Sequence, residues 1–270
     1  MPGPLAVPDK SRTPIARMTR AVPPTSMIPM NKTPTILATS GGYKNGERIF
    51  TEFNHLVMYS LELSGTTRSK PKLGYLDTAA GDQHYRLAQR YEAARLAGVE
   101  LNPLQLFVMP NVEDIEGYLM EQDAVWVDGG SVANLLAVWR VHDLDQIFRR
   151  VWEAGIVLAG VSAGSICWHR GGTTDSFGPE LRAVTNGLGL IPYDNGVHYD
   201  VEKRRRPTVH RLVAEGILGK TYCTDNNVGL VYRGTELAEA VSEVPGKSAW
   251  VVTKDNGEVI EERLETRFLG

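Results

Sequence analysis

The feature that most constrains the fold is a regular alternation of short apolar runs with helical segments over residues 35–168. Apolar runs typical of buried strands occur at 35–40, 72–78, 104–108, 124–127 and 156–159. Helices are predicted at 49–63, at 85–97 and from about residue 132. Strands that alternate with helices form a parallel sheet with helices on both faces, and each crossover is expected to be right-handed.

The pattern changes beyond Arg170. A helix is predicted at 208–218, and short strands separated by turns are predicted at 221–224, 229–232, 237–241 and 249–253. Such a meander is expected to extend one edge of the sheet with antiparallel strands. The predicted fold is therefore α/β with three layers, a mostly parallel sheet covered by helices on both faces, and antiparallel edge strands near the C-terminus.

The first 32 residues differ in composition from the rest. They are rich in proline, and Lys10, Arg12, Arg17 and Arg20 face a single acid, Asp9. Prolines interrupt any apolar stretch long enough for a secretory signal. We therefore predict a disordered tail at residues 1–32 and one α/β domain at residues 33–270.

Composition limits the classes of partner. The net charge is −3 and the pI is about 6.1, which gives no reason to expect a nucleic acid or an anionic membrane as partner. The two cysteines, Cys167 and Cys223, are too few for a disulfide framework and are consistent with a cytoplasmic protein. We predict no metal site and no cofactor, and the sequence allows a homodimer.

One motif carries chemistry, the segment Gly160-Val161-Ser162-Ala163-Gly164. It follows the apolar run 156–159 directly and leads into a predicted helix. A serine in this G-x-S-x-G context occupies a sharp strand-to-helix turn that exposes its hydroxyl at the carboxyl edge of the sheet. We predict that Ser162 is a nucleophile; the alternative is a glycine-rich turn without chemistry.

A serine nucleophile needs a base, which is most often a histidine. The chain has six histidines: His55, His84, His142, His169, His198 and His210. His198 is the preferred base because it lies in a loop after Asp194 and Gly196, and catalytic groups are often mounted on loops. His84, at the start of a predicted helix, is the second candidate. His169 is expected two turns down the helix that follows Ser162, pointing away from it.

The base needs an orienting partner, and the oxyanion needs two donors. Asp225 and Asn226, after the predicted strand 221–224, are the preferred partners of His198, with Asp200 and Asp175 as further options. The backbone N–H of Ala163 can supply one oxyanion donor, and the Gly129-Gly130 segment can supply the other. A tight turn without a catalytic role is the alternative reading of these two glycines.

Four segments together resemble one family. GVSAGSICW, WVDGGSVANLL, GLGLIPYDNGVHYD and TDNNVGLVYRG resemble the nucleophile, oxyanion, histidine and acid segments of the peptidase E and cyanophycinase group, peptidase family S51. The resemblance runs from about Thr35 to Val252 and implies a fold like that of class I glutamine amidotransferases. It implies that Ser162 is the nucleophile, His198 the base, and Gly130 with Ala163 the oxyanion hole. Where the family has a glutamate, this chain has Asn226, preceded by Asp225.

The resemblance also suggests a substrate. Peptidase E hydrolyses dipeptides with an N-terminal aspartate, which requires a positive charge near the bound side chain. The run Lys203-Arg204-Arg205-Arg206 follows the histidine segment, and Arg206 is our predicted substrate ligand; a solvated basic turn is the alternative. The resemblance thus implies a serine-type peptidase acting on small peptides, with Asp-X dipeptides as candidates.

Two other functions remain open from sequence. A binding or regulatory protein that keeps the fold but has an impaired Ser-His-Asn triad is the main alternative, and Asn226 is its support. A glutaminase-like amidotransferase is disfavoured because that chemistry uses a cysteine at the position of Ser162, and Cys167 is five residues away.

Overall fold

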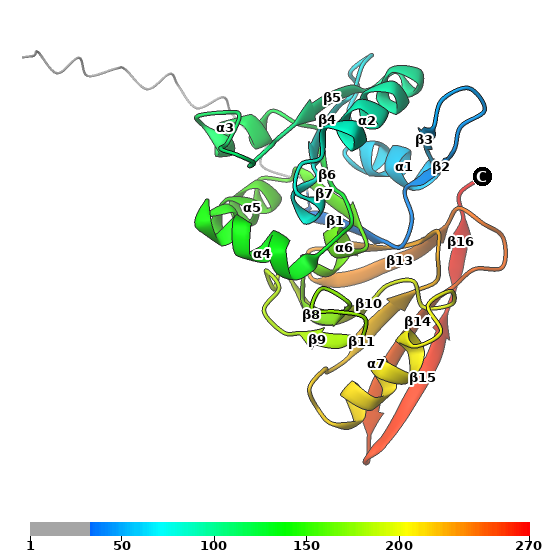
Figure 1. The fold of residues 1–270 in the computed structure, drawn as a ribbon. Helices are drawn as coiled ribbons and strands as arrows, with labels where there is room; N and C mark the ends of the chain where they lie inside the picture. The colour runs from blue at the N-terminus through cyan, green and yellow to red at the C-terminus, as the bar shows by residue number, and fades with distance from the viewer. Residues whose placement is uncertain (1–32) are drawn as a thin grey trace, which may run out of the picture.

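The computed structural model describes residues 33–270, which form two large β-sheets and a separate two-stranded hairpin, with helices packed around them (Figure 1). The larger sheet has eight strands in the order β16-β13-β12-β1-β7-β6-β4-β5. Its parallel strands are β1 (Thr35–Thr39), β4 (Lys72–Leu76), β5 (Glu100–Pro103), β6 (Ala124–Val127) and β7 (Val157–Val161). The predicted α/β class with a mostly parallel sheet is confirmed, whereas the predicted tail at residues 1–32 lies outside the described residues.

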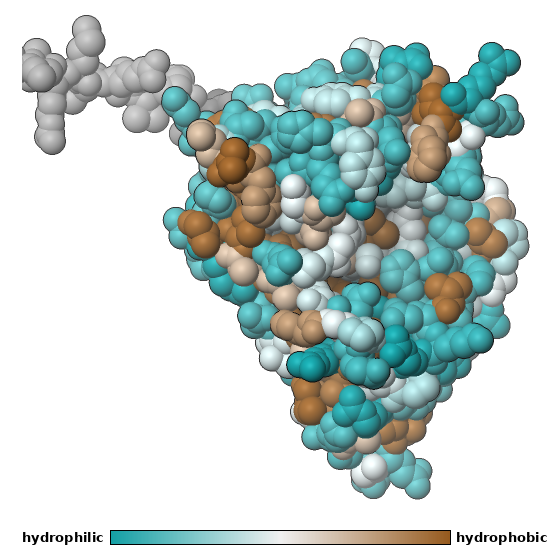
Figure 2. All heavy atoms as spheres, in the orientation of Figure 1, coloured by the Kyte–Doolittle hydropathy of each residue, from teal (hydrophilic) through white to brown (hydrophobic). Residues whose placement is uncertain are grey.

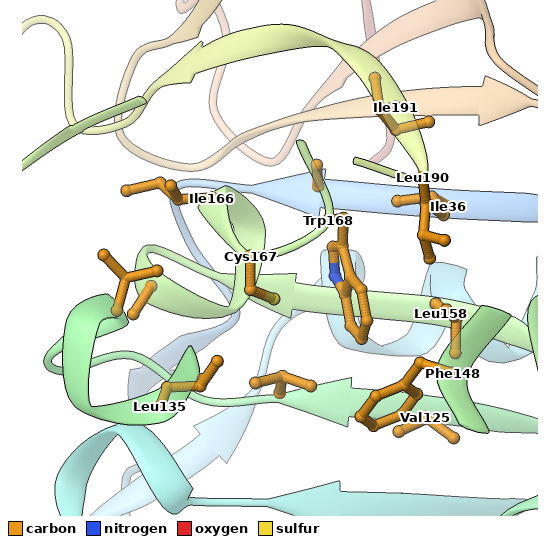
Figure 3. Packing of buried hydrophobic residues seen from close by; sticks show 14 of the residues in the cluster. Ile36, Val125, Leu135, Phe148, Leu158, Ile166, Cys167, Trp168, Leu190 and Ile191 are labelled. Carbon is orange, nitrogen blue, oxygen red and sulfur yellow. The ribbon is translucent and has the colours of Figure 1, made fainter. Parts of the chain in front are cut away.

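Helices cover both faces of this sheet. Alternate residues of each strand point to opposite faces, so a strand that is apolar throughout needs cover on both. Ile36 and Ala38 of β1 belong to one apolar cluster, and Leu37 belongs to another. The first face is covered by α4 (Val132–Val141) and α5 (Leu144–Glu153), with α3 (Ile115–Met120) against α5. The second face is covered by α1 (His55–Leu63) and α2 (His84–Ala97). Figure 3 shows Trp168 and Phe148 in contact over the first face, close to Leu158 and Val125.

A second sheet of six strands in the order β15-β14-β11-β10-β8-β9 lies in the lower half of the view in Figure 1. Its strands are β8 (His169–Thr174), β9 (Arg182–Val184), β10 (Ile191–Gly196), β11 (Thr221–Thr224), β14 (Ala249–Asp255) and β15 (Glu258–Leu264). Ile191 and Tyr222 from this sheet share an apolar cluster with Ile36 of β1. The helix α7 (Arg205–Ala214) packs on the second sheet through Val209 and Leu212.

The second sheet corrects the predicted meander. Strands β12 (Val228–Arg233) and β13 (Glu236–Ser242) extend the first sheet antiparallel, as predicted, and β16 (Thr266–Phe268) pairs with β13. The predicted strands 221–224 and 249–253, however, pair with each other in the second sheet. The turn between β11 and β12 carries the chain from one sheet to the other, so consecutive strands are not neighbours.

Three local predictions were wrong in their bounds. The helix predicted at 49–63 begins only at His55, where Asn54 accepts hydrogen bonds from the N–H groups of the first helical turn, and residues 43–53 form the hairpin of β2 (Tyr43–Asn45) and β3 (Thr51–Phe53). A strand is predicted at 104–108, but the observed strand β5 lies just before it and ends at Pro103. The helix after Ser162 is the short α6 (Ala163–Ile166), so His169 begins strand β8 instead of continuing a helix.

The surface is mainly hydrophilic on the face shown in Figure 2, with apolar side chains in small separate groups. The most exposed large apolar side chains among residues 33–270 are Val108, Phe50, Val141 and Met109. They come from three different segments of the chain, which is usual for a globular protein. No helix in this part of the chain is long and apolar enough to cross a membrane.

Candidate active site

Ser162 lies on a strained turn between β7 and α6. Its backbone has φ 59° and ψ −113°, a region that residues other than glycine rarely adopt. Gly160 and Gly164 permit the turn, because a Cβ at Gly160 would lie 2.4 Å from the Gly164 carbonyl oxygen. A Cβ at Gly164 would in turn lie 2.1 Å from the carbonyl oxygen of Val127. This is the strand–turn–helix geometry that exposes a nucleophile.

The Gly129-Gly130 segment lies beside Ser162. A Cβ at Gly129 would be 3.1 Å from the Ser162 Cβ and 3.7 Å from its Oγ. Gly130 has φ +150°, and a Cβ there would be 2.4 Å from the carbonyl oxygen of Ala79, in the short 3-10 helix η1 (Thr78–Ala80). Ala163 is the first residue of α6, so its N–H has no acceptor within that helix. The backbone segments predicted to form the oxyanion hole therefore lie next to Ser162, the predicted nucleophile.

The end of β1 connects Ser162 to His198. The Ser162 N–H donates to the Thr39 carbonyl at 3.0 Å, and the His198 N–H donates to the Ser40 Oγ at 3.0 Å. Thr39, the last residue of β1, and Ser40, which follows it, thus hold the backbones of the predicted nucleophile and base. His198 follows β10 and also has a positive φ, 54°.

Asn226, and not Asp225, contacts the imidazole of His198. Strands β10 and β11 are parallel, so the residues that follow them meet at one edge. The Asn226 Oδ1 lies 2.5 Å from the His198 Nδ1, and it accepts the Nδ1 proton when the ring carries its hydrogen there. This leaves Nε2 as the free nitrogen for a proton from serine.

The Asp225 carboxylate points away from the imidazole and is buried. It accepts hydrogen bonds from the Ser248 N–H and the Trp250 Nε1, each at 3.0 Å. The other predicted carboxylate, Asp200, accepts the Asn226 N–H at 2.8 Å and pairs with Lys247. Burial raises the pKa of Asp200, but these contacts outweigh burial and hold it below the ordinary value. Asp200 and Asp225 thus fix the turn that presents Asn226.

Arg206, the predicted substrate ligand, already has partners within the protein. Its guanidinium is 3.0 Å from the Glu261 carboxylate and stacks on the rings of Tyr199 and Trp250, at 4.7 Å and 4.5 Å from their centroids. Its charge is balanced by Glu261, 55 positions later in the chain, while the side chain stays partly exposed. Arg206 therefore ties α7 to β15.

The other histidines have different environments. His84 is exposed at the start of α2, and His55 lies at the start of α1, 3.1 Å from Glu243. His210 pairs with Glu261 at 2.7 Å, and His142 ends α4. His169 is fully buried, and burial lowers its pKa to about 4. Among residues 33–270, no three side chains of the types that bind metals lie together in a potential site.

Sequence reasoning missed a buried ionic network next to the Gly129-Gly130 segment. The Asp128 Oδ2 accepts from the Tyr75 hydroxyl at 2.8 Å, from Arg86 at 3.0 Å and from Arg90 at 3.1 Å. Asp77 lies 3.0 Å from the Arg86 Nε. The available signal was an aspartate directly after each of the strands β4 and β6, together with two arginines four residues apart on α2, which lie on one helix face.

Comparison with known proteins identifies the family of this chain. Residues 36–240 match the model of peptidase family S51. The uncharacterized peptidase YgaJ of Bacillus subtilis (strain 168) is 36% identical over 208 residues, covering 77% of this chain and 89% of that protein.

Two solved structures have a similar fold. A peptidase from an acI-B1 actinobacterium superposes with a TM-score of 0.64 at 17% identity, covering 87% of this chain and 96% of that one. A putative peptidase E protein from Listeria monocytogenes EGD-e superposes with a TM-score of 0.51 at 16% identity, covering 86% and 98%.

Proposed function

This chain belongs to peptidase family S51 and is a peptidase, and we propose that it hydrolyses small peptides through an acyl-enzyme on Ser162. The observation that carries the proposal is the arrangement at the end of β1. Thr39 and Ser40 hold the strained Ser162 turn and the His198 backbone, while Asn226 holds the imidazole.

The proposed reaction has two steps. His198 Nε2 takes the proton of the Ser162 hydroxyl as its Oγ attacks the peptide carbonyl, and the N–H groups of Gly130 and Ala163 stabilise the oxyanion. The C–N bond then breaks, and the protonated His198 donates its proton to the leaving amine. In the second step, water gives a proton to His198 and attacks the ester carbonyl. The bond from that carbon to the Ser162 Oγ then breaks, and the protonated His198 returns its proton to the Oγ, which releases the acid and restores the serine.

Asn226 gives this arrangement a particular character. A neutral amide orients the imidazole through Oδ1 but does not neutralise the imidazolium formed when His198 takes a proton, as in Cys-His-Asn peptidases. We therefore expect catalysis to depend strongly on geometry. The Asn226→Ala variant should fall between the wild type and His198→Ala in kcat/KM, because it loses the orienting contact and keeps the base.

The test is covalent labelling of Ser162 by a fluorophosphonate probe, with peptide hydrolysis measured on the same samples. Ser162→Ala should abolish both, and His198→Ala should slow both by about 10²–10⁴-fold. His84→Ala is the matched control, since His84 is exposed and was the second candidate base; it should keep wild-type rates. A folded wild type that no probe labels between about pH 6 and pH 9 contradicts the proposal.

The substrate is addressed with dipeptides that carry an acidic, neutral or basic first residue. We propose small peptides as the class and Asp-X dipeptides as its first member to test. Because Glu261 pairs with Arg206, we expect that Arg206→Met leaves the order of preference unchanged. A loss of Asp-X preference in this variant would instead show that Arg206 contributes to substrate binding.

A second candidate is supported by Asn226 alone. With a neutral residue in the orienting position, the chain could bind a peptide without turnover. Under that alternative, dipeptides raise the thermal unfolding temperature of wild type and Ser162→Ala equally, and no product forms over long incubation. Product formation that depends on Ser162 excludes it.

A further inference from the structure

Arg86 reaches from α2 to the backbone next to Ser162. Its Nη2 lies 3.0 Å from the Asp128 Oδ2 and 3.4 Å from the Gly129 carbonyl oxygen. An arginine Nη2 carries two hydrogens, so one nitrogen can serve both acceptors. The Gly129 carbonyl belongs to the same peptide unit as the Gly130 N–H, which is the proposed oxyanion donor.

The planarity of the peptide unit makes this contact directional. In a trans peptide the C=O and N–H groups point to opposite sides, so fixing one fixes the other. We propose that Arg86 is a positioning residue that holds the Gly129 carbonyl and thereby aims the Gly130 N–H toward the oxyanion at Ser162. This inference rests on the acyl-enzyme function proposed above.

The glycine pair needs such a hold. Glycine adopts backbone angles of either sign with little cost, so a peptide between two glycines is free to rotate. The chain just beyond is fixed, because the Ser131 N–H donates to the Ala79 carbonyl at 2.9 Å. The described contacts of the Gly129 carbonyl include one side-chain donor, Arg86.

Arg86 is itself held by acidic side chains on two sides. Its Nη2 donates to Asp128 at 3.0 Å, and the Asp77 carboxylate lies 3.0 Å from its Nε as an ion-pair partner without a hydrogen bond. Arg90 approaches the same oxygen of Asp128 at 3.1 Å but does not contact the Gly129 carbonyl. Arg90 therefore shares the ionic network without the proposed role, which makes it a matched control.

The test compares Arg86→Met, Arg86→Lys and Arg90→Met for thermal unfolding, kcat, KM and the rate of fluorophosphonate labelling. Loss of one oxyanion donor lowers kcat by about 10²–10³-fold, and we expect this for Arg86→Met with KM nearly unchanged. Labelling should slow in parallel, because the phosphoryl oxygen occupies the same site. Arg86→Lys should recover part of the rate, whereas Arg90→Met should lose as much thermal stability with less than about a ten-fold loss of kcat.

Equal losses of kcat in Arg86→Met and Arg90→Met would overturn the inference, as would a loss confined to KM. A crystal structure of Arg86→Met gives an independent answer: a Gly129 carbonyl that keeps its wild-type direction contradicts the positioning role. If wild type neither hydrolyses peptides nor labels at Ser162, the proposed function fails first, and that failure is distinct because it appears without any change at Arg86.

Discussion

His169 makes the stability of this protein depend on pH in a way that the structure quantifies. The side chain is fully buried between the two sheets, with Nδ1 2.9 Å from the Ser165 carbonyl and Nε2 3.2 Å from the Tyr232 hydroxyl. Neither partner is a carboxylate, so nothing in direct contact balances a positive charge on the ring. Burial therefore lowers the pKa from 6.5 to about 4.

The sign and size follow from proton linkage. Between pH 6.5 and about pH 4, His169 is protonated in the unfolded chain but stays neutral in the folded protein. Acidification therefore favours unfolding in this range. One pKa unit corresponds to about 1.4 kcal/mol, and a drop from 6.5 to about 4 gives about 3 kcal/mol. The free energy of unfolding has its full value with respect to His169 above pH 6.5, and it has fallen by this amount at about pH 4.

The assay is urea unfolding followed by tryptophan fluorescence at four pH values from 7 to 4, on wild type and His169→Gln. The variant loses the titrating ring, so the difference in the free energy of unfolding between the two proteins isolates it. That difference should shift by about 3 kcal/mol toward the variant on acidification. His84→Gln, at an exposed histidine, should follow the wild type. A difference between wild type and His169→Gln that stays constant from pH 7 to pH 4 refutes the reasoning.

Three further outcomes are expected. Burial raises the pKa of Asp77 from 3.8 to about 7, so its contribution to stability is present below pH 4 and lost as the pH rises through 7. In the same urea assay, the free energy of unfolding of wild type should fall by up to about 4 kcal/mol relative to Asp77→Asn over this pH range. Cys167 and Cys223 are buried with raised pKa values, so iodoacetamide at pH 8 should label neither until urea unfolds the protein; fast labelling of the native state contradicts their burial. Trp168→Ala removes a fully buried ring from the cluster in Figure 3 and should lower the free energy of unfolding by about 3–5 kcal/mol in the urea assay. The exposed control Phe50→Ala should lower it by less than about 0.5 kcal/mol, and similar losses in the two variants would contradict the packing.

Features set by local sequence could be predicted. The run 124–127 became β6 with the same bounds, and the G-x-S-x-G segment became the strained Ser162 turn. Both depend on neighbouring residues: β-branched and aromatic side chains favour a strand, and glycines permit a tight crossing.

Features set by contacts distant in sequence could not be predicted. Asp225 and Asn226 are adjacent in one turn. They point in different directions because the Asp225 carboxylate accepts hydrogen bonds from Ser248, just before β14, and from Trp250 on β14. A basic run such as that at Arg206 reveals charge, but not the Glu261 that neutralises it. In the same way, the sequence shows no sign that β11 and β12 belong to different sheets.

The division into two sheets has a mechanical consequence. Ser162 is carried by the first sheet, while His198 and Asn226 follow strands of the second, and the Ser40 hydroxyl is one of the contacts between the two. A small displacement of one sheet relative to the other would leave both sheets intact but change the distance between Ser162 and His198, the proposed nucleophile and base. If the proposed mechanism holds, we expect turnover to fall when the second sheet is perturbed, before spectroscopy detects unfolding.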